Sequence, residues 1–193
     1  MSTHLPEDAE YFPSKFRDCF DFDEGPMLPT PKGIRKLIHY FLWQRYSISV
    51  NLRLSQYFDR KEGKFRSLTR LLAKSFCRRN EVKNNCEISS SALIARGTVF
   101  HHGGVVITSG SVIEAEVHLY RNVILGNNRG KAPVVKKGAK LGSNSVVVGG
   151  ISIGENAIVA PGAVVVKSVP NGVVVGGVPA IYICVATEEN RDF

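Results

Sequence analysis

A six-residue period runs through the second half of the chain and restricts the folds open to it. An α-helix repeats every 3.6 residues and an alternating strand every two, so neither element explains this period. Six residues suffice for a short strand and a turn, and three such units close one triangular coil. Stacked coils pair their strands in parallel and bury a continuous aliphatic column. The recurring large apolar residues are Ile88, Ile94, Phe100, Ile107, Ile113, Leu119, Leu125, Val135, Leu141, Val147, Ile153, Val159 and Val165.

Small residues and glycines support the same interpretation. A small or compact residue precedes many of the period's aliphatics by two positions, where a corner would be: Pro133, Ala139, Ser145, Ile151, Ala157 and Ala163. Of the 18 glycines, only three precede residue 97. The sequence therefore predicts an irregular acidic arm over 1–30, a basic α-helical segment over 31–85, a parallel β-helix over 86–183 and a C-terminal tail over 184–193.

Composition excludes several classes of protein. The 193 residues are 44% apolar, which is typical of a folded domain. No run of 18 uncharged apolar residues is present, so a transmembrane helix is disfavoured. The N-terminus lacks the apolar region of a secretory signal. The four cysteines have no CxxC spacing, which argues against a zinc ribbon. These observations favour a cytoplasmic protein with reduced thiols.

Positive charge is concentrated in the middle of the chain. The net charge is +8, but residues 32–83 alone hold fourteen Lys/Arg and three Asp/Glu. Two interpretations stay open: a helical cap whose polar face is basic, or attraction to an acidic surface such as anionic lipid, nucleic acid or a polyanionic substrate. Nucleic acid is disfavoured because no recognised motif accompanies the charge. Helical stripes are predicted at Ile34, Leu37, Ile38, Phe41 and Leu42, and again at Phe65, Leu68, Leu71, Leu72 and Phe76.

The stretch IARGTVFHHGGVVITSGSVIEAEVHLYRNVILGNN and the later VPNGVVVGGVPAIYI ending resemble the hexapeptide-repeat acyltransferases. The resemblance covers about residues 86–183, and its Gly-x-Pro-Ala ending is the family's closing motif. It implies a left-handed β-helix, a homotrimer and acetyl-CoA bound between neighbouring β-helices. The closest branch contains serine O-acetyltransferase and O-acetyltransferases of polysaccharide pathways. A helical segment shorter than that of serine acetyltransferases favours the polysaccharide branch.

The first break in the period contains a histidine pair, His101 and His102. A neutral imidazole is the usual base near pH 7 for acyl transfer to a hydroxyl. Counting forward from Gly97 matches the family's catalytic histidine to His102, and counting backward from Ile113 matches it to His101. We favour His102, because the Gly103–Gly104 that follows it resembles an HGG element of the polysaccharide-type branch. A second count agrees, because Glu87 stands fifteen residues before His102, where the family has a carboxylate that orients the base. Glu114 and Glu116 are alternative partners.

The second break, GNNRGKAP, contains basic residues. In serine acetyltransferases this loop carries an Arg-His pair that binds the substrate carboxylate, and Lys131 and Ala132 stand there in this chain. Arg121, Arg129 and Lys131 are predicted to bind the acceptor. The family's coenzyme site implies Gly142, Ser143, Gly149, Ala160 and Lys167. No metal is expected, because His118 is the one further histidine nearby and is interpreted as an ordinary surface or interface residue.

The sequence therefore predicts an acetyl-CoA-dependent O-acetyltransferase acting on a sugar hydroxyl in polysaccharide biosynthesis. Two alternatives stay open: serine O-acetyltransferase of cysteine biosynthesis, which the NRDF ending disfavours, and a non-catalytic hexapeptide scaffold. The predicted partners are a saccharide acceptor and two further copies of the chain, with no nucleic acid. Pairing of trimers and a peripheral membrane contact are left open.

Overall fold

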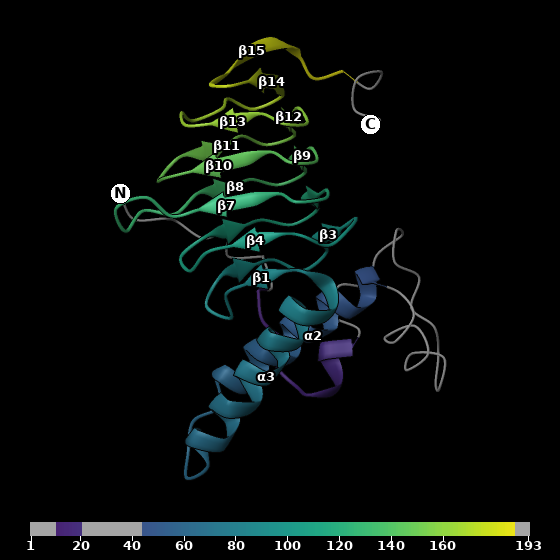
Figure 1. Cartoon of the computed structure of the whole chain (residues 1–193), viewed down its shortest axis with the longest axis vertical. Helices are drawn as coiled ribbons and strands as arrows, with labels where there is room; N and C mark the ends of the chain where they lie inside the picture. Colours follow the sequence, from purple (N-terminus) through teal and green to yellow (C-terminus); the bar gives the residue numbers. More distant parts are fainter. Residues whose placement is uncertain (1–10, 21–43, 188–193) are drawn as a thin grey trace.

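A three-sided solenoid of short parallel strands stands on a pair of helices in the computed structural model (Figure 1), which describes residues 11–20 and 44–187. The parallel β-helix predicted from the period, with the left hand that the resemblance implies, is confirmed. The first sheet contains β1 (Glu87–Ile88), β4 (Val106–Ile107), β7 (Ile124–Gly126), β10 (Val146–Val148) and β13 (Val164–Val165). The second contains β2 (Leu93–Ile94), β5 (Val112–Ile113), β8 (Val134–Val135) and β11 (Ser152–Ile153). The third contains β3 (Val99–Phe100), β6 (His118–Leu119), β9 (Lys140–Leu141), β12 (Ile158–Val159), β14 (Val173–Gly177) and β15 (Ala180–Val185).

The aliphatic column lies inside the solenoid, as the period predicts. All thirteen recurring apolar residues are buried, none more than 6% exposed. Burial of one such side chain contributes roughly 1.5–3 kcal/mol to folding, so the column is the principal source of stability. At the top of the solenoid the parallel pairing ends, because β15 turns back and pairs antiparallel with β14.

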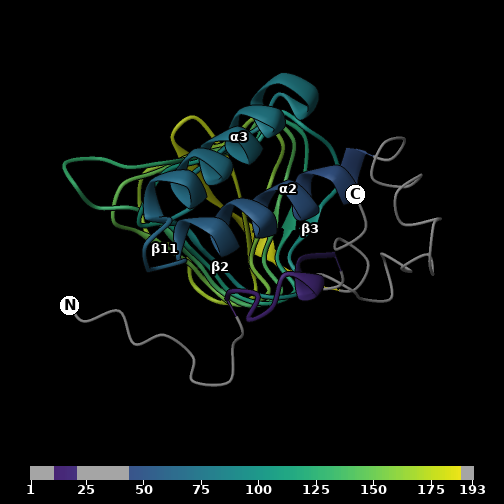
Figure 2. The same cartoon turned by 90° about the horizontal axis from the view of Figure 1, so that it is seen from below.

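Two helices lie across the lower end of the solenoid (Figure 2): α2 (Gln44–Asp59) and α3 (Arg66–Asn84). Eleven consecutive residues of α2, from Tyr46 to Gln56, are buried. The predicted stripe over Ile34–Leu42 falls outside the described residues. Part of the predicted arm is packed: Tyr11 is buried, and Cys19, in the short helix η1 (Arg17–Phe20), is buried against α2. None of the described helices is both long and apolar enough to cross a bilayer.

The lower edge of the first coil explains why α2 is rich in polar residues. Each coil donates its N–H groups to the coil above, as in Leu93 N–H to the carbonyl of Ser111, so the first coil's own carbonyls lack a strand below. Side chains of α2 supply the donors. Arg53 donates to the carbonyls of Ile94 (2.8 Å) and Ala95 (3.2 Å), and Gln56 donates to the carbonyl of Ala92 (3.1 Å).

Candidate functional site

The two histidines follow β3 directly, at the corner where the chain passes from the third sheet to the first. We call residues 101–105 the histidine corner. His101 is buried, at 9% exposed, whereas His102 is exposed. The end of β3 therefore places two histidine side chains in different environments, one buried and one exposed to solvent.

Residues of the next coil hold the ring of His101. Its Nε2 lies 2.9 Å from Nδ1 of His118, with one nitrogen donating and the other accepting. The ring also stacks on Tyr120, with centroids 4.2 Å apart and planes 6° apart. The backbone of His101 is fixed on both sides: its N–H donates to the carbonyl of Leu119, and its carbonyl accepts from Nε of Arg45 at 2.9 Å. The peptide that leads into His102 is thus held in place from two directions.

Burial, together with the neighbouring charges of His118 and Arg45, lowers the pKa of His101 to about 4. Burial also lowers the pKa of His118, with Lys140 contributing in the same direction. His101 is therefore neutral near pH 7, but it is a weak base and its Nε2 is already hydrogen-bonded. A general base is most effective when its pKa lies near the working pH. This environment favours His102 over His101 as the proton acceptor.

The depressed pKa of His101 predicts a stability loss in mild acid. The unfolded chain takes up this proton near pH 6.5, whereas the folded chain takes it up only near pH 4. Unfolding therefore binds protons in this window, and the free energy of unfolding should fall as the pH drops from about 6.5 to about 4. Urea unfolding across that window measures the slope. His101→Phe, which can still stack on Tyr120, should flatten it; an unchanged slope in this variant would contradict the assignment.

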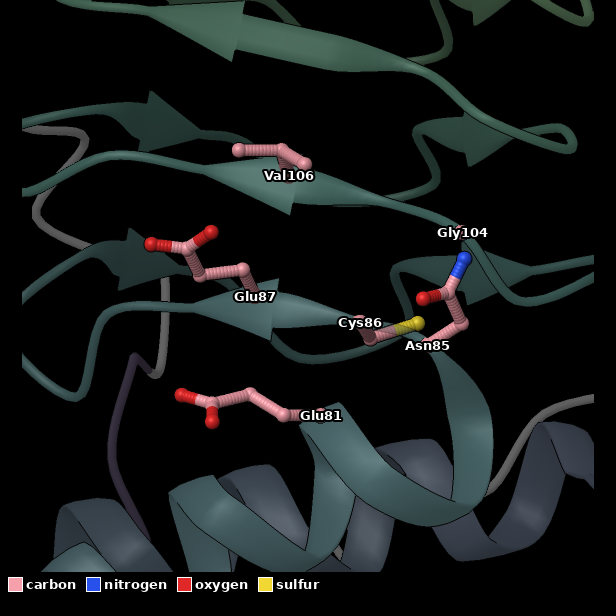
Figure 3. A pocket seen from close by; sticks show the side chains of 6 residues that line it. All are labelled: Glu81, Asn85, Cys86, Glu87, Gly104 and Val106. Atoms are coloured by element: carbon pink, nitrogen blue, oxygen red, sulfur yellow. The ribbon is translucent and has the colours of Figure 1, made fainter.

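Glu87 lies on β1 in the first sheet, beside Val106 of β4. It lines a cavity of about 310 Å³ together with Glu81 of α3, Asn85, Cys86, Gly104 and Val106. Figure 3 shows the carboxylates of Glu87 and Glu81 pointing away from Gly104, which belongs to the histidine corner. No hydrogen bond joins Glu87 to His102 within the described chain, so their pairing stays a prediction. Of the alternative partners, Glu114 accepts from the backbone N–H of Lys137, and Glu116 forms an ion pair with the Lys137 side chain.

The basic loop of the second break lies at a different corner. Residues 127–133 connect β7 of the first sheet to β8 of the second, and this loop projects from the solenoid on the side opposite to β3 (Figure 1). Arg129 (φ +52°) and Lys131 are exposed there. Arg121 lies instead at the corner of the histidines, one coil above them, and is exposed. One chain therefore brings Arg121 near the histidines, while Arg129 and Lys131 lie across the width of the first sheet.

The residues predicted to bind the coenzyme divide between the same two corners. Gly142 and Ser143 follow β9, and Ala160 follows β12, so these three stand above the histidine corner. Gly149 follows β10 and Lys167 follows β13, on the side of the basic loop. A Cβ at Gly142 would come within 2.7 Å of the backbone nitrogen of Pro161, so only glycine allows the coils to approach this closely here.

Three residues at the site were not identified from the sequence. His118 was interpreted as an ordinary surface or interface residue and is half-buried against His101, and Tyr120 and Arg45 were not considered. The coil repeat contained the signal for His118 and Tyr120, because residues one coil apart stack on each other. His118 pairs with Val99 and Leu119 with Phe100, so both residues lie beside His101. No group of three His, Cys, Asp or Glu side chains close enough to hold a metal occurs in residues 11–20 and 44–187.

Comparison with known proteins shows what the chain resembles. Residues 132–167 match the family model "bacterial transferase hexapeptide (six repeats)". A serine acetyltransferase of Buchnera aphidicola subsp. Schizaphis graminum is 33% identical over 112 residues, 55% of this chain and 43% of that protein. A second, from Buchnera aphidicola subsp. Acyrthosiphon pisum, is 34% identical over 100 residues, 49% of this chain and 36% of that protein. The chain thus matches less than half the length of these relatives.

Solved structures agree on the fold. Serine acetyltransferase from Brucella abortus superposes with a TM-score of 0.70 at 23% identity, covering 89% of this chain and 68% of that one. The Neisseria gonorrhoeae enzyme gives 0.72 at 21% identity, covering 90% and 67%. A serine acetyltransferase in complex with CoA gives 0.71 at 24% identity, covering 87% and 70%. All three structures are less than 25% identical to this chain, so they show the fold, in agreement with the repeats matched over residues 132–167.

One prediction from the sequence is corrected by these matches. The polysaccharide branch was favoured because the helical segment is short and the basic loop lacks the Arg-His pair. The matched relatives are instead serine acetyltransferases, and the similarity extends over 112 and 100 residues of this chain. The saccharide acceptor and the polysaccharide pathway are therefore not supported. Short helical segments and single loop residues vary more readily than a repeating core, which made them poor guides to the branch.

Proposed function

We propose that this chain is an acetyl-CoA-dependent O-acetyltransferase whose acceptor is the hydroxyl of serine. The observation that carries the proposal is the 33% identity over 112 residues to a serine acetyltransferase. An exposed histidine at the break in the repeat provides the chemistry that such a reaction needs. A cytoplasmic location, where thiols stay reduced, belongs to the same proposal.

In the proposed reaction, His102 removes the proton from the serine hydroxyl as its oxygen attacks the thioester carbonyl. The new C–O bond produces a tetrahedral intermediate. Its collapse breaks the C–S bond, and the proton on His102 passes to the departing CoA thiolate. No covalent enzyme intermediate is required. His101 acts as a positioning residue, because its ring and backbone are fixed by His118, Tyr120 and Arg45.

The separation of the two corners supports a site shared between chains. In one chain, His102 precedes strand β4 of the first sheet and the basic loop follows strand β7, so they lie at opposite ends of the strands of that sheet. A neighbouring copy that places its 127–133 loop beside the histidine corner would unite them, and a homotrimer does this three times by symmetry. In that arrangement Arg129 and Lys131 would bind the serine carboxylate, with Arg121 beside the histidines. The coenzyme would lie along Gly142, Ser143 and Ala160 of one chain. Gly149 and Lys167, on the side of the basic loop, would come from the neighbouring copy.

The direct test is release of free CoA thiol from acetyl-CoA by the purified full chain. We expect turnover with L-serine and none above background with a panel of sugars. D-serine and L-alanine are matched controls, because the first changes only the geometry and the second lacks the hydroxyl. Turnover with a sugar but not with serine would overturn the acceptor. Absence of turnover with every acceptor, together with failure to bind CoA, would favour the scaffold alternative.

A further inference from the structure

One face of α3 carries apolar side chains that none of residues 11–20 and 44–187 covers. The sequence pattern predicted a single packed stripe, but the structure divides it. Leu72 and Phe76 are half-buried toward α2, whereas Phe65, Leu68 and Leu71 are 71%, 55% and 65% exposed. Val82, further along the same side, is 72% exposed. The steps from Leu68 through Leu71 to Val82 keep these residues on the side of α3 opposite to the buried Ala73 and Asn80.

Cations surround this face. Residues 61–84 contain eight Lys/Arg and two Asp/Glu. Lys64, Arg66, Arg70, Lys74 and Arg78 are all exposed. Glu81 forms an ion pair with Arg78. The other cations outnumber the acidic side chains, so the surface around the apolar residues is strongly positive. The combination of exposed leucine and phenylalanine with a dense rim of Lys/Arg is typical of helices that lie in the surface of an anionic bilayer.

The helical hairpin also has a suitable position. Figure 1 shows the turn between α2 and α3 as the part of the described molecule that extends furthest below the solenoid. Phe65 belongs to this turn, and Leu68 and Leu71 follow in the first turns of α3. A flat surface could therefore contact Phe65, Leu68 and Leu71 at the end of the hairpin without touching the histidine corner, because the corner contacts the opposite end of α3, where the carbonyl of Asn84 accepts from the N–H of Gly104.

We propose that the exposed face at the start of α3, formed by Phe65, Leu68 and Leu71 with their flanking cations, docks on anionic lipid. Charge complementarity decides between the possible occupants. A second copy of α3 would bring two strongly positive surfaces together, which is unfavourable. RNA would satisfy the cations but would leave the leucines without an apolar partner. An anionic bilayer satisfies both, because its headgroups pair with the cations and its acyl boundary accepts the apolar side chains. This inference is independent of the proposed reaction.

Cosedimentation of the full chain with vesicles tests the proposal. We expect binding to phosphatidylcholine vesicles that contain phosphatidylglycerol to be at least about tenfold stronger than to phosphatidylcholine alone, and to weaken with added salt. Leu68→Ser/Leu71→Ser and Arg70→Glu/Lys74→Glu should each weaken binding by about tenfold or more. The matched control is Ile181→Ser/Ile183→Ser on β15, where the two side chains are 68% and 55% exposed, and it should bind as the parent does. Thermal unfolding of each variant confirms that the fold is kept.

Four outcomes would overturn the proposal. The first is failure of the parent chain to bind anionic vesicles, and the second is equal loss in the β15 control. The third is binding that depends on Arg70 and Lys74 but not on Leu68 and Leu71, especially if a single-stranded RNA oligonucleotide binds in the same way, because the surface would then be a polyanion site. A shift to smaller assemblies in Leu68→Ser/Leu71→Ser, seen by sedimentation velocity, would identify an interface between copies instead.

Discussion

Replacement of His102 by alanine is expected to lower kcat for serine acetylation by about 10²–10⁴-fold, the usual contribution of a general base. His102 is exposed at the break in the repeat, so its removal leaves no cavity and should not alter stability. Thiol release measured at saturating serine and acetyl-CoA gives kcat directly. Calorimetric titration with CoA should show unchanged coenzyme affinity, which separates a loss of chemistry from a loss of binding.

His101→Gln provides the contrast. Its ring is buried, stacked on Tyr120 and bonded to His118, so replacement should lower stability as well as activity. If His102→Ala retained more than about a tenth of kcat while a folded His101→Gln were inactive, the assignment would have to be reversed. The pH profile distinguishes the two further, because a base with the pKa of His101, about 4, would leave kcat independent of pH across the neutral range.

The solenoid was predictable because its repeat encodes its geometry residue by residue. The large apolar residue that recurs about every six positions faces inward, and each of these residues is buried in the structure. The breaks were equally visible as departures from the period, and both became corner features, the histidine corner and the 127–133 loop. A repeat therefore indicates where a site is expected, even when it does not indicate what the function is.

Contacts across coils were less accessible from the sequence. Pairing of His101 with His118 and Tyr120 depends on the length of each coil, and the first coil is set by an irregular break. The helices exposed a different limit. A stripe at helical spacing indicates an apolar face, but the spacing does not show whether that face packs against the protein or is exposed. Leu68 and Leu71 continue the stripe of Phe76, yet they lie outside the helix pair.

The polar residues of α2 were likewise unpredicted, and they point to a structural requirement of the solenoid. A stack of parallel coils always ends in an edge whose carbonyls have no strand to accept from. In this chain the edge is covered by a helix with a buried arginine, rather than by another coil. Arg53 donates to the carbonyls of Tyr11, Ile94 and Ala95 and to the side-chain oxygen of Gln56. One guanidinium thus joins the N-terminal arm, α2 and the first coil.

Arg53→Met is therefore expected to destabilise the protein by about 3–5 kcal/mol, because three buried carbonyls lose a charged donor at once. Methionine keeps much of the side-chain volume, so the loss measures hydrogen bonding rather than a cavity. Urea unfolding at one fixed protein concentration gives the free energy of unfolding. Arg70→Met on the exposed side of α3 is the matched control and should change stability by no more than about 0.5 kcal/mol. A change below about 1 kcal/mol in Arg53→Met would show that water or the remaining side chains satisfy the lower edge without it.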